Sequence, residues 1–407
     1  MISVHEFSKS IQRTRFFRWK LAVVVFLMVT VVLCFNPING YFLLTDADDK
    51  ATRIAIGVQG LPSLAGVGDF NGDHHPDVLL VGSGADDGHQ VDFWSVRFGD
   101  GKGGFVLESE FRTMADATSL AIGDFTGDGK DDYAVTYTTT LFLAIHASNG
   151  EGIFPFLNGV ELDSFPVGLG TADFNQDQKL DLVVLEAGFG AGSNVAILLG
   201  NGDGGFQNPQ RIAVGRGSRS LVIADINGDQ HPDIATANAG SNDVSLLINT
   251  TIQPAARTLV FDQTTIENIG NSPATIAAGN FNQDGIPDLV VGTTNGVMFL
   301  AGTGNGSFAE AQTVLSGKKV QSGQLYVNSG DFNGDGITDV VVSPFGNRAS
   351  KIVILFGSAS KPLQQKLKLT AGNNPLQVVT GNIDGNHQTD LIVFNRQPQQ
   401  VTVVLNV

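Results

Sequence analysis

The chain has 407 residues and a formal net charge of −16, with 40 acidic side chains against 24 basic ones. An acidic surface repels phosphate backbones, so this balance argues against a nucleic-acid-binding protein. The single cysteine, Cys34, excludes a fold held together by disulfide bonds within the chain, so stability must come from a hydrophobic core or from bound metal.

The first 40 residues have the form of an export signal. Residues 1–20 carry five basic side chains and one acidic one, and an uninterrupted apolar run, 21–35, follows them. A cleaved signal peptide should offer small residues at a cleavage site, and the linker 36–40 offers no convincing one. A membrane anchor should have about 20 apolar residues, and aromatic residues just before the run lengthen it. We favour the anchor, and the basic flank then places the N-terminus in the cytoplasm and the rest outside.

A nine-residue pattern occurs seven times in residues 41–407. It has Asp or Asn at positions 1 and 5, an apolar residue at position 2, Asn, Thr or Asp at position 3, and Asp at position 9. Successive copies begin 49 to 55 residues apart, at Asp69, Asp124, Asp173, Asp225, Asn280, Asp331 and Asn382. A regular spacing of this size predicts a repeat architecture.

Each repeat has the same internal order. A short apolar segment ends in glycine or alanine directly before position 1, and a β-rich apolar run follows position 9. A third apolar run leads into a Gly-rich turn that ends in Phe in several repeats, such as 200–206, and a fourth run follows. Four short strands per repeat, without a helical period, predict an all-β fold: a seven-bladed β-propeller of four-stranded blades. A linear solenoid is the alternative.

The two ends of the repeat region predict that the ring closes on itself. The last repeat stops at 401–407, after its third strand, and an unpaired segment, 52–57, precedes the first pattern. That segment resembles 210–215, which is the fourth strand of a complete repeat. We therefore expect the N-terminal strand to complete blade seven, which would remove an open sheet edge.

The aspartate pattern, its Phe at position 2 and the Gly-rich turn resemble the FG-GAP/VCBS repeats of integrin α-subunit propellers and of many bacterial surface proteins. The resemblance covers essentially all of residues 41–407. It implies an integrin α-like propeller fold and a calcium-binding role for the nine-residue loops. It does not specify a function, because this fold serves many roles.

The residues of the loops themselves also suit a hard cation. Ca²⁺ prefers six to eight oxygen ligands, and positions 1, 3, 5 and 9 of each loop offer four oxygen-bearing side chains. An EF-hand is excluded, because a strand follows each loop and position 12 is not Glu in the first loops. The candidate ligands are Asp69, Asn71, Asp73, Asp77, Asp124, Thr126, Asp128, Asp132, Asp173, Asn175, Asp177, Asp181, Asp225, Asn227, Asp229, Asp233, Asn280, Asn282, Asp284, Asp288, Asp331, Asn333, Asp335, Asp339, Asn382, Asp384, Asn386 and Asp390.

The seven loops are not equivalent. Those starting at Asn280 and Asn382 have two carboxylates instead of three, so we expect them to bind calcium weakly or not at all. The alternative for every loop is a metal-free turn in which Asp and Asn accept hydrogen bonds from their own backbone. Clustered carboxylates repel one another without a cation, which favours calcium in several loops.

The sequence shows no catalytic constellation: residues 41–407 have no cysteine nucleophile, no G-x-S-x-G motif and no H-E-x-x-H motif. We therefore expect a non-enzymatic binding or adhesion module outside the cytoplasm, in the periplasm, at the cell surface or secreted. Its partners would be a protein or a glycan, with the membrane reached through the N-terminal segment. A structural element of an envelope complex and a polysaccharide-acting enzyme are the alternatives. The segments 86–89 and 250–273 are predicted to be polar surface loops, and Trp94 to pack inside a blade.

Overall fold

The computed structural model describes residues 34–36, 41–45, 52–87, 89–114, 116–187, 192–316, 325–344, 351–370, 375–396 and 399–405. The predicted basic segment, and all but the last two residues of the predicted apolar run, lie outside these ranges. Within them, no helix is long and apolar enough to cross a membrane.

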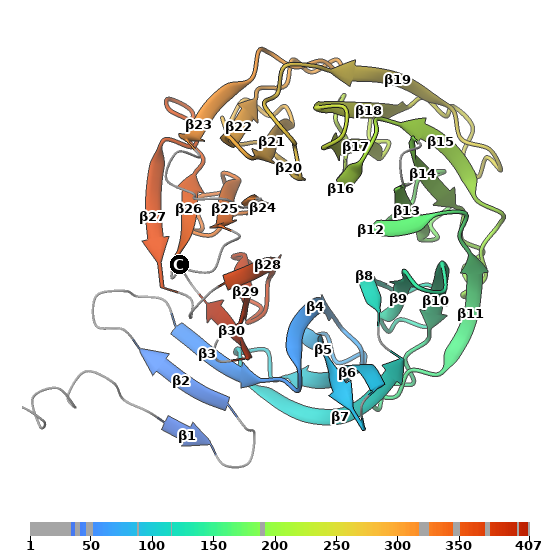
Figure 1. Cartoon of the computed structure of the whole chain (residues 1–407), viewed down its shortest axis with the longest axis vertical. Helices are drawn as coiled ribbons and strands as arrows, with labels where there is room; N and C mark the ends of the chain where they lie inside the picture. The colour runs from blue at the N-terminus through green and yellow to red at the C-terminus, as the bar shows by residue number, and fades with distance from the viewer. Residues whose placement is uncertain are drawn as a thin grey trace, which may run out of the picture.

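The described chain forms a ring of seven antiparallel sheets around a central axis (Figure 1). Blade one contains β4 (Leu61–Gly68), β5 (Asp77–Asp86), β6 (His89–Gly99) and β7 (Phe105–Met114). Blade two contains β8 (Ala117–Gly123), β9 (Asp132–Tyr137), β10 (Phe142–His146) and β11 (Phe156–Glu161). Blade three contains β12 (Phe165–Ala172), β13 (Asp181–Ala187), β14 (Ser193–Leu198) and β15 (Gln210–Val214).

Blades four to six repeat this order. Blade four contains β16 (Ser218–Ala224), β17 (Asp233–Asn238), β18 (Asp243–Asn249) and β19 (Phe261–Ile266). Blade five contains β20 (Thr275–Gly279), β21 (Asp288–Thr293), β22 (Gly296–Leu300) and β23 (Gln312–Ser316). Blade six contains β24 (Leu325–Gly330), β25 (Asp339–Pro344), β26 (Ile352–Phe356) and β27 (Gln365–Leu369). The seven-bladed propeller predicted from the repeats is confirmed.

Blade seven joins the two ends of the chain. It contains β28 (Pro375–Gly381), β29 (Asp390–Asn395), β30 (Gln400–Leu405) and, as fourth strand, β3 (Thr52–Gly57). β3 pairs antiparallel with β30, with Ile54 opposite Val403. The predicted closure by the N-terminal strand is therefore confirmed. Two further strands, β1 (Cys34–Asn36) and β2 (Tyr41–Thr45), extend this sheet outward (Figure 1).

The core lies between the blades. The second and third strands are almost continuously buried, because sheets pack against both of their faces, and their sequences are correspondingly rich in Val, Ile and Leu. Position 2 of every nine-residue pattern is at most 2% exposed, so this apolar side chain anchors the loop in the core. Trp94 is also buried, between Phe111 and Tyr133, as the sequence predicted.

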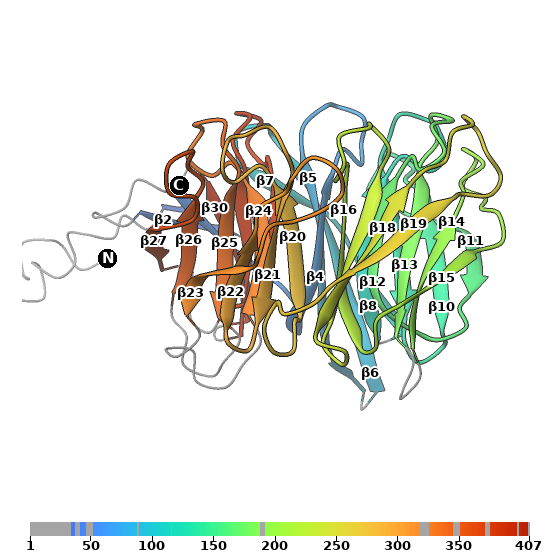
Figure 2. The same ribbon diagram turned by 90° about the horizontal axis from the view of Figure 1, so that it is seen from above.

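The ring has two faces with different connections (Figure 2). Inner strands lead into the nine-residue patterns, and third strands lead back to the same side through the Gly-rich turns or their equivalents. We call this side the loop face. The hairpins between second and third strands, and the connections from one blade to the next, lie on the other side, which we call the hairpin face. The predicted polar segment 86–89 is the tip of the β5–β6 hairpin, whereas the predicted loop 250–273 also contains the outer strand β19.

The closing strand offers a test of the fold. Ile56 is fully buried opposite Val401, so Ile56→Ala should lower the free energy of unfolding by about 2–5 kcal/mol through the cavity it leaves. It should also speed hydrogen exchange in 400–405. The control Val106→Ala, at an exposed position of an outer strand, should change stability by less than about 0.5 kcal/mol. Unchanged exchange in β30 after Ile56→Ala would contradict closure by β3.

Candidate functional site

All predicted metal-ligating residues lie in the seven nine-residue loops, and all seven loops lie on the loop face. The reason is the shared direction of the inner strands β4, β8, β12, β16, β20, β24 and β28, each of which ends directly before position 1. The structure therefore groups the four positions of one loop, but it distributes the seven loops around the ring (Figure 1).

Within a loop, the side chains at positions 1, 3 and 5 accept hydrogen bonds from the loop's own backbone. In blade six, Asp331 accepts from Gly334 N at 2.7 Å through Oδ1 and from Gly336 N at 2.8 Å through Oδ2. Asn333 Oδ1 accepts from Asp335 N at 2.9 Å, and Asp335 Oδ1 accepts from Ile337 N at 2.8 Å. The loop thus winds around its first carboxylate.

This winding requires left-handed backbone at positions 4 and 6. In blade six both positions are glycine, with φ of 75° and 79°. In other loops larger residues adopt the same conformation, for example His74, Gln178 and Gln230 at position 6, with φ of 64° to 69°. These side chains are strained there relative to glycine, so the loop's own hydrogen bonds must offset that strain.

Position 9 ties the loop to the rest of its blade. Asp181 has no exposed surface; its Oδ2 accepts from Phe174 N and its Oδ1 accepts from Gly200 N, both at 2.8 Å. Phe174 lies at position 2 of the same loop, and Gly200 lies where the third strand ends. Equivalent pairs of bonds occur at Asp77, Asp132, Asp233, Asp288 and Asp339.

Burial perturbs the acidity of these carboxyl groups. Desolvation raises the pKa of Asp77, Asp181, Asp233 and Asp288 to about 6 and that of Asp339 to about 7. The two backbone N–H donors act in the opposite direction and favour the ionised form. Neighbouring carboxylates of the same loop raise the pKa further, as Asp335 and Asp331 do for Asp339.

The loops also bond each blade to the next. The carbonyl at position 2 accepts a hydrogen bond from the third-to-fourth-strand turn of the following blade: Ser148 Oγ bonds Phe70 O at 2.6 Å, and Gly204 N bonds Phe125 O at 2.8 Å. The same carbonyl in blades three and five accepts from Asn249 Nδ2 and Ser358 N, both at 2.9 Å.

The small residue before position 1 leaves space for a side chain of the next blade. A Cβ at Gly123 would lie 2.5 Å from Leu180 Cδ1, and one at Gly330 would lie 2.5 Å from Thr389 Cγ2. Leu180 and Thr389 both occupy position 8 of the following loop. The glycine or alanine that precedes position 1 in every repeat is therefore explained by the close approach of the next blade.

The donor chemistry of the loops fits calcium, since every candidate ligand offers oxygen. In this structure, however, the loops are hydrogen-bonded turns, and backbone N–H groups already donate to the carboxylates that would bind the metal. Across the described ranges, no three His, Cys, Asp or Glu side chains are grouped closely enough to hold a metal ion. Calcium binding by these loops therefore stays a prediction.

Two loops stand apart electrostatically. In blade two, Lys130 Nζ lies 2.6 Å from Asp128 Oδ2, and this contact lowers the pKa of Asp128, so a cation is supplied by the chain itself. In blade seven, Asn382 Oδ1 is buried without a hydrogen-bond partner among the described residues, unlike the first-position oxygens of blade six. Lys130 therefore offsets part of the negative charge that the three carboxylates of the blade-two loop provide.

A second feature, a central cavity of about 1,090 Å³, lies on the ring axis. Residues from all seven inner strands line it, together with some residues just before these strands. Most of them lie in the first half of each strand, so the cavity occupies the half of the channel nearer the hairpin face. Its polar lining is mostly neutral: Ser63, Thr118, Ser119, Ser220, Thr275, Asn328, Gln377 and Tyr326. Among the described lining residues, Arg219 alone carries a formal charge at neutral pH.

The sequence gives only a weak signal of this cavity: inner strands begin with short polar stretches, such as 117–119 and 217–220, before their apolar second halves. Those residues come together only because seven strands surround one axis, and no single repeat contains the cavity.

Comparison with known proteins adds the following. A family described as FG-GAP-like repeat matches residues 69–135, 124–184, 173–236, 225–291, 280–342 and 331–393, so each matched span runs from one nine-residue loop through the next. No functionally curated protein sequence matches this chain.

Solved structures resemble it at the level of the fold. A structure on recognition of non-reducing terminal N-acetylglucosamine by a lectin from Agrocybe aegerita is 16% identical, with a TM-score of 0.55 over 87% of this chain and 93% of that one. BBS1N in complex with ARL6DN is 12% identical, with a TM-score of 0.57 over 93% and 98%. A protein from Lactobacillus plantarum is 12% identical, with a TM-score of 0.54 over 79% and 88%.

The raised pKa values predict a pH dependence in metal-free buffer. A carboxyl group whose folded pKa lies above its ordinary 3.8 stabilises the fold at low pH, and this contribution is lost as pH rises through the folded pKa. The urea midpoint should therefore fall between pH 4 and pH 7, and it should fall less in Asp339→Asn, which cannot ionise there. The control Asp203→Asn, in an exposed turn, should keep the wild-type slope. An identical slope in both variants would contradict the assignment.

Proposed function

Because this chain belongs to the FG-GAP-like repeat family, and because its ring encloses a neutral polar cavity, we propose that it is a non-catalytic binding module for a glycan. The proposed binding surface is the hairpin face around the central cavity. The loop face, in this proposal, holds the blades together and does not contact the ligand.

The lining of the cavity is the observation that carries the proposal. Hydroxyl and amide groups can both donate and accept hydrogen bonds, which suits the many hydroxyl groups of a sugar chain. A volume of about 1,090 Å³ is slightly larger than that of most small-molecule pockets, so it has room for more than one sugar residue. The single cationic side chain, Arg219, gives the cavity little net charge with which to select an ionic ligand.

The fold itself is compatible with glycan binding, since one structurally similar protein is a lectin. A protein partner is the second candidate, and exposed apolar side chains favour it. Val106, Leu107, Ile153, Phe156 and Leu157 are all at least 40% exposed on the outer side of blades one and two. Exposed apolar groups that gather in this way mark protein contacts, and BBS1N, a propeller of similar fold, has ARL6DN as its partner.

We propose further that the propeller lies outside the cytoplasm, membrane-anchored or secreted, and that several nine-residue loops bind calcium. The basic and then apolar N-terminal sequence supports the location. The clustered carboxylates support the metal, because a divalent cation would offset both the burial of the charge and the repulsion from neighbouring carboxylates, which together raise the pKa at position 9. The loops of blades one, three, four and six have three carboxylates each and, unlike blade two, no ion pair with a described lysine side chain, so they are the strongest candidates.

Calcium should be detectable through stability. If several loops each bind calcium, excess EDTA should lower the Tm of the full chain, and Ca²⁺ should restore it. Calcium at 100 times its Kd adds about 2.7 kcal/mol per site to the free energy of unfolding. Mg²⁺ at equal ionic strength is the control for charge screening, and it should restore much less. An unchanged Tm in EDTA, together with no calcium by elemental analysis, would refute metal binding.

Binding at the central cavity can be tested on a glycan array with the full chain. Tyr326→Phe and Ser119→Ala, which each remove one cavity hydroxyl, should weaken retention of a bound glycan about three- to tenfold. Thr264→Ala, which removes an exposed hydroxyl from an outer strand, should leave retention unchanged. Glycan retention that all three variants preserve would exclude the cavity as the site. Selective capture of a protein, with no glycan retained, would favour the second candidate.

A further inference from the structure

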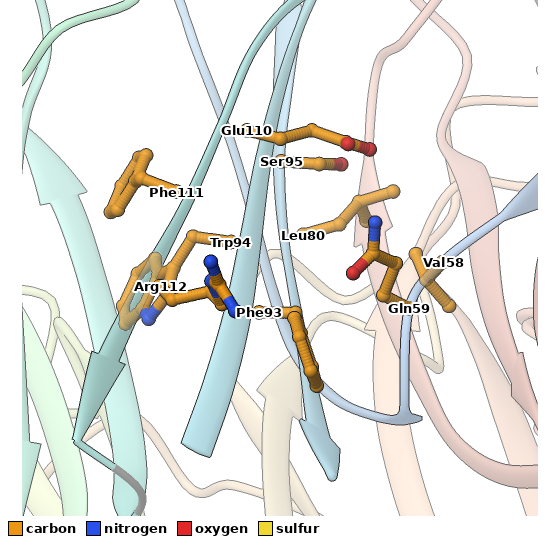
Figure 3. A pocket seen from close by; sticks show the side chains of 9 residues that line it. All are labelled: Val58, Gln59, Leu80, Phe93, Trp94, Ser95, Glu110, Phe111 and Arg112. Atoms are coloured by element: carbon orange, nitrogen blue, oxygen red, sulfur yellow. The ribbon is translucent and has the colours of Figure 1, made fainter. Parts of the chain in front are cut away.

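A second cavity, of about 380 Å³, lies between blade one and the chain that leaves the closing strand (Figure 3). We call it the clasp pocket, and it is lined by Val58, Gln59, Leu80, Phe93, Trp94, Ser95, Glu110, Phe111 and Arg112. Val58 and Gln59 belong to the connection between β3 and β4, so one wall exists only when the N-terminal strand is in place.

The opposite wall is one face of blade one. Ser95 pairs with Leu80 on one side and with Glu110 on the other, and Phe93 pairs with Arg112, so these five side chains share a face. Figure 3 shows Ser95 and Glu110 extending side by side toward Val58 and Gln59. Trp94 and Phe111 point to the other side of the sheet.

A buried hydroxyl in this pocket has no partner. Ser95 is 6% exposed, and its Oγ makes no hydrogen bond to any residue that the structure describes. Buried hydroxyl groups are ordinarily hydrogen-bonded, because leaving one unpaired costs free energy. The adjacent residue on the same face, Arg97, is 5% exposed and has an unpartnered Nε. An unsatisfied hydroxyl group that lines a cavity indicates a partner supplied from outside the chain.

The charges around the clasp pocket compensate one another. Glu110 is attracted to Arg97, whose Nη2 donates to Gly57 O at 3.2 Å. Arg112 forms an ion pair with Asp86. Since both charged lining residues have a counter-charge nearby, the pocket offers hydrogen-bonding groups without a net charge to attract an ion. This balance favours an uncharged polar ligand over a phosphate, a carboxylate or an amine.

The pocket also offers a fixed apolar surface. Phe93 is half-buried, and its ring lies over the backbone of Gly84, where an added Cβ would come within 2.9 Å of the ring. Leu80, which is buried, continues this surface toward Val58. Aromatic and aliphatic groups next to hydrogen-bonding side chains match a sugar ring, whose C–H face is apolar and whose hydroxyl groups lie around its edge.

We propose that the clasp pocket binds one uncharged pyranose residue, with its C–H face against Phe93 and its hydroxyl groups bonded to Ser95 Oγ, the Glu110 carboxylate and the Gln59 amide. This inference deepens the glycan-binding function proposed above by assigning a second subsite, separate from the central cavity. The pocket takes a wall from the connection that follows the closing strand, so ring closure and sugar binding are coupled here.

The test uses the full chain and four uncharged methyl glycosides, those of glucose, galactose, mannose and N-acetylglucosamine, in saturation-transfer NMR and calorimetry. At least one glycoside should bind, and Ser95→Ala should weaken it about three- to tenfold. Phe93→Leu and Glu110→Gln should also weaken binding. Ser95→Ala should leave the Tm unchanged or slightly higher, because the hydroxyl it removes has no partner in the fold.

Two matched controls separate this proposal from the one before it. Glu108→Gln, at an exposed position of the same outer strand and outside the pocket, should bind as the wild type does. If Ser119→Ala in the central cavity weakens glycoside binding while Ser95→Ala has no effect, the clasp pocket is refuted and the central site stands. If Ser95→Ala weakens it and Ser119→Ala has no effect, the glycosides bind at the clasp pocket and not at the central site.

Two other outcomes would also overturn the proposal. A Tm lowered by Ser95→Ala with unchanged glycoside affinity would show that the hydroxyl group serves the fold. Preferential binding of an acidic or an amino sugar, measured with methyl glucuronoside and methyl glucosaminide, would refute the uncharged ligand. Failure of all four neutral glycosides to bind would refute the pocket as a pyranose site.

Discussion

The buried aspartate at position 9 is the interaction on which the ring depends. Its two oxygens accept hydrogen bonds from two backbone N–H groups that the sheet leaves unpaired: one at the start of the nine-residue loop and one at the end of the third strand. Both groups are buried, and a buried N–H without a partner would destabilise the blade. One side chain therefore fixes the positions of the inner, second and third strands, and the same solution recurs around the ring.

The burial of this carboxylate has an electrostatic consequence. Desolvation and the neighbouring acidic groups raise the pKa of Asp339 to about 7, although two amide donors favour ionisation. The loop thus has more negative charge than its hydrogen bonds neutralise. Blade two partly relieves the excess with Lys130, and the proposed calcium ions would relieve it in other blades. The strongly negative net charge of the chain follows from this repeated arrangement.

The repeats made the fold predictable, and they did so for physical reasons. Each structural requirement recurs seven times: a small residue where the next blade approaches, an apolar residue under the loop, and an aspartate at position 9. Closure by 52–57 was predictable because the missing strand of blade seven has a recognisable sequence. The outer strand β19 was not, because its exposed, polar residues 262–265 lack the apolar run by which the other strands were identified.

The binding features could not be predicted in the same way, because no single repeat contains either of them. The central cavity is made by all seven inner strands together, whereas the clasp pocket exists only where blade one meets the connection that leaves the closing strand. Ser95 lies in a strand whose pattern simply predicts burial. Only the structure shows that it lines the clasp pocket and that its hydroxyl group has no hydrogen-bond partner among the described residues. The same stabilising hydrogen bonds recur in the loops of the loop face. The junction between blade one and the closing segment departs from the sevenfold repeat of the ring. A ligand can be recognised specifically at such a junction, because no other blade interface contains the same side chains.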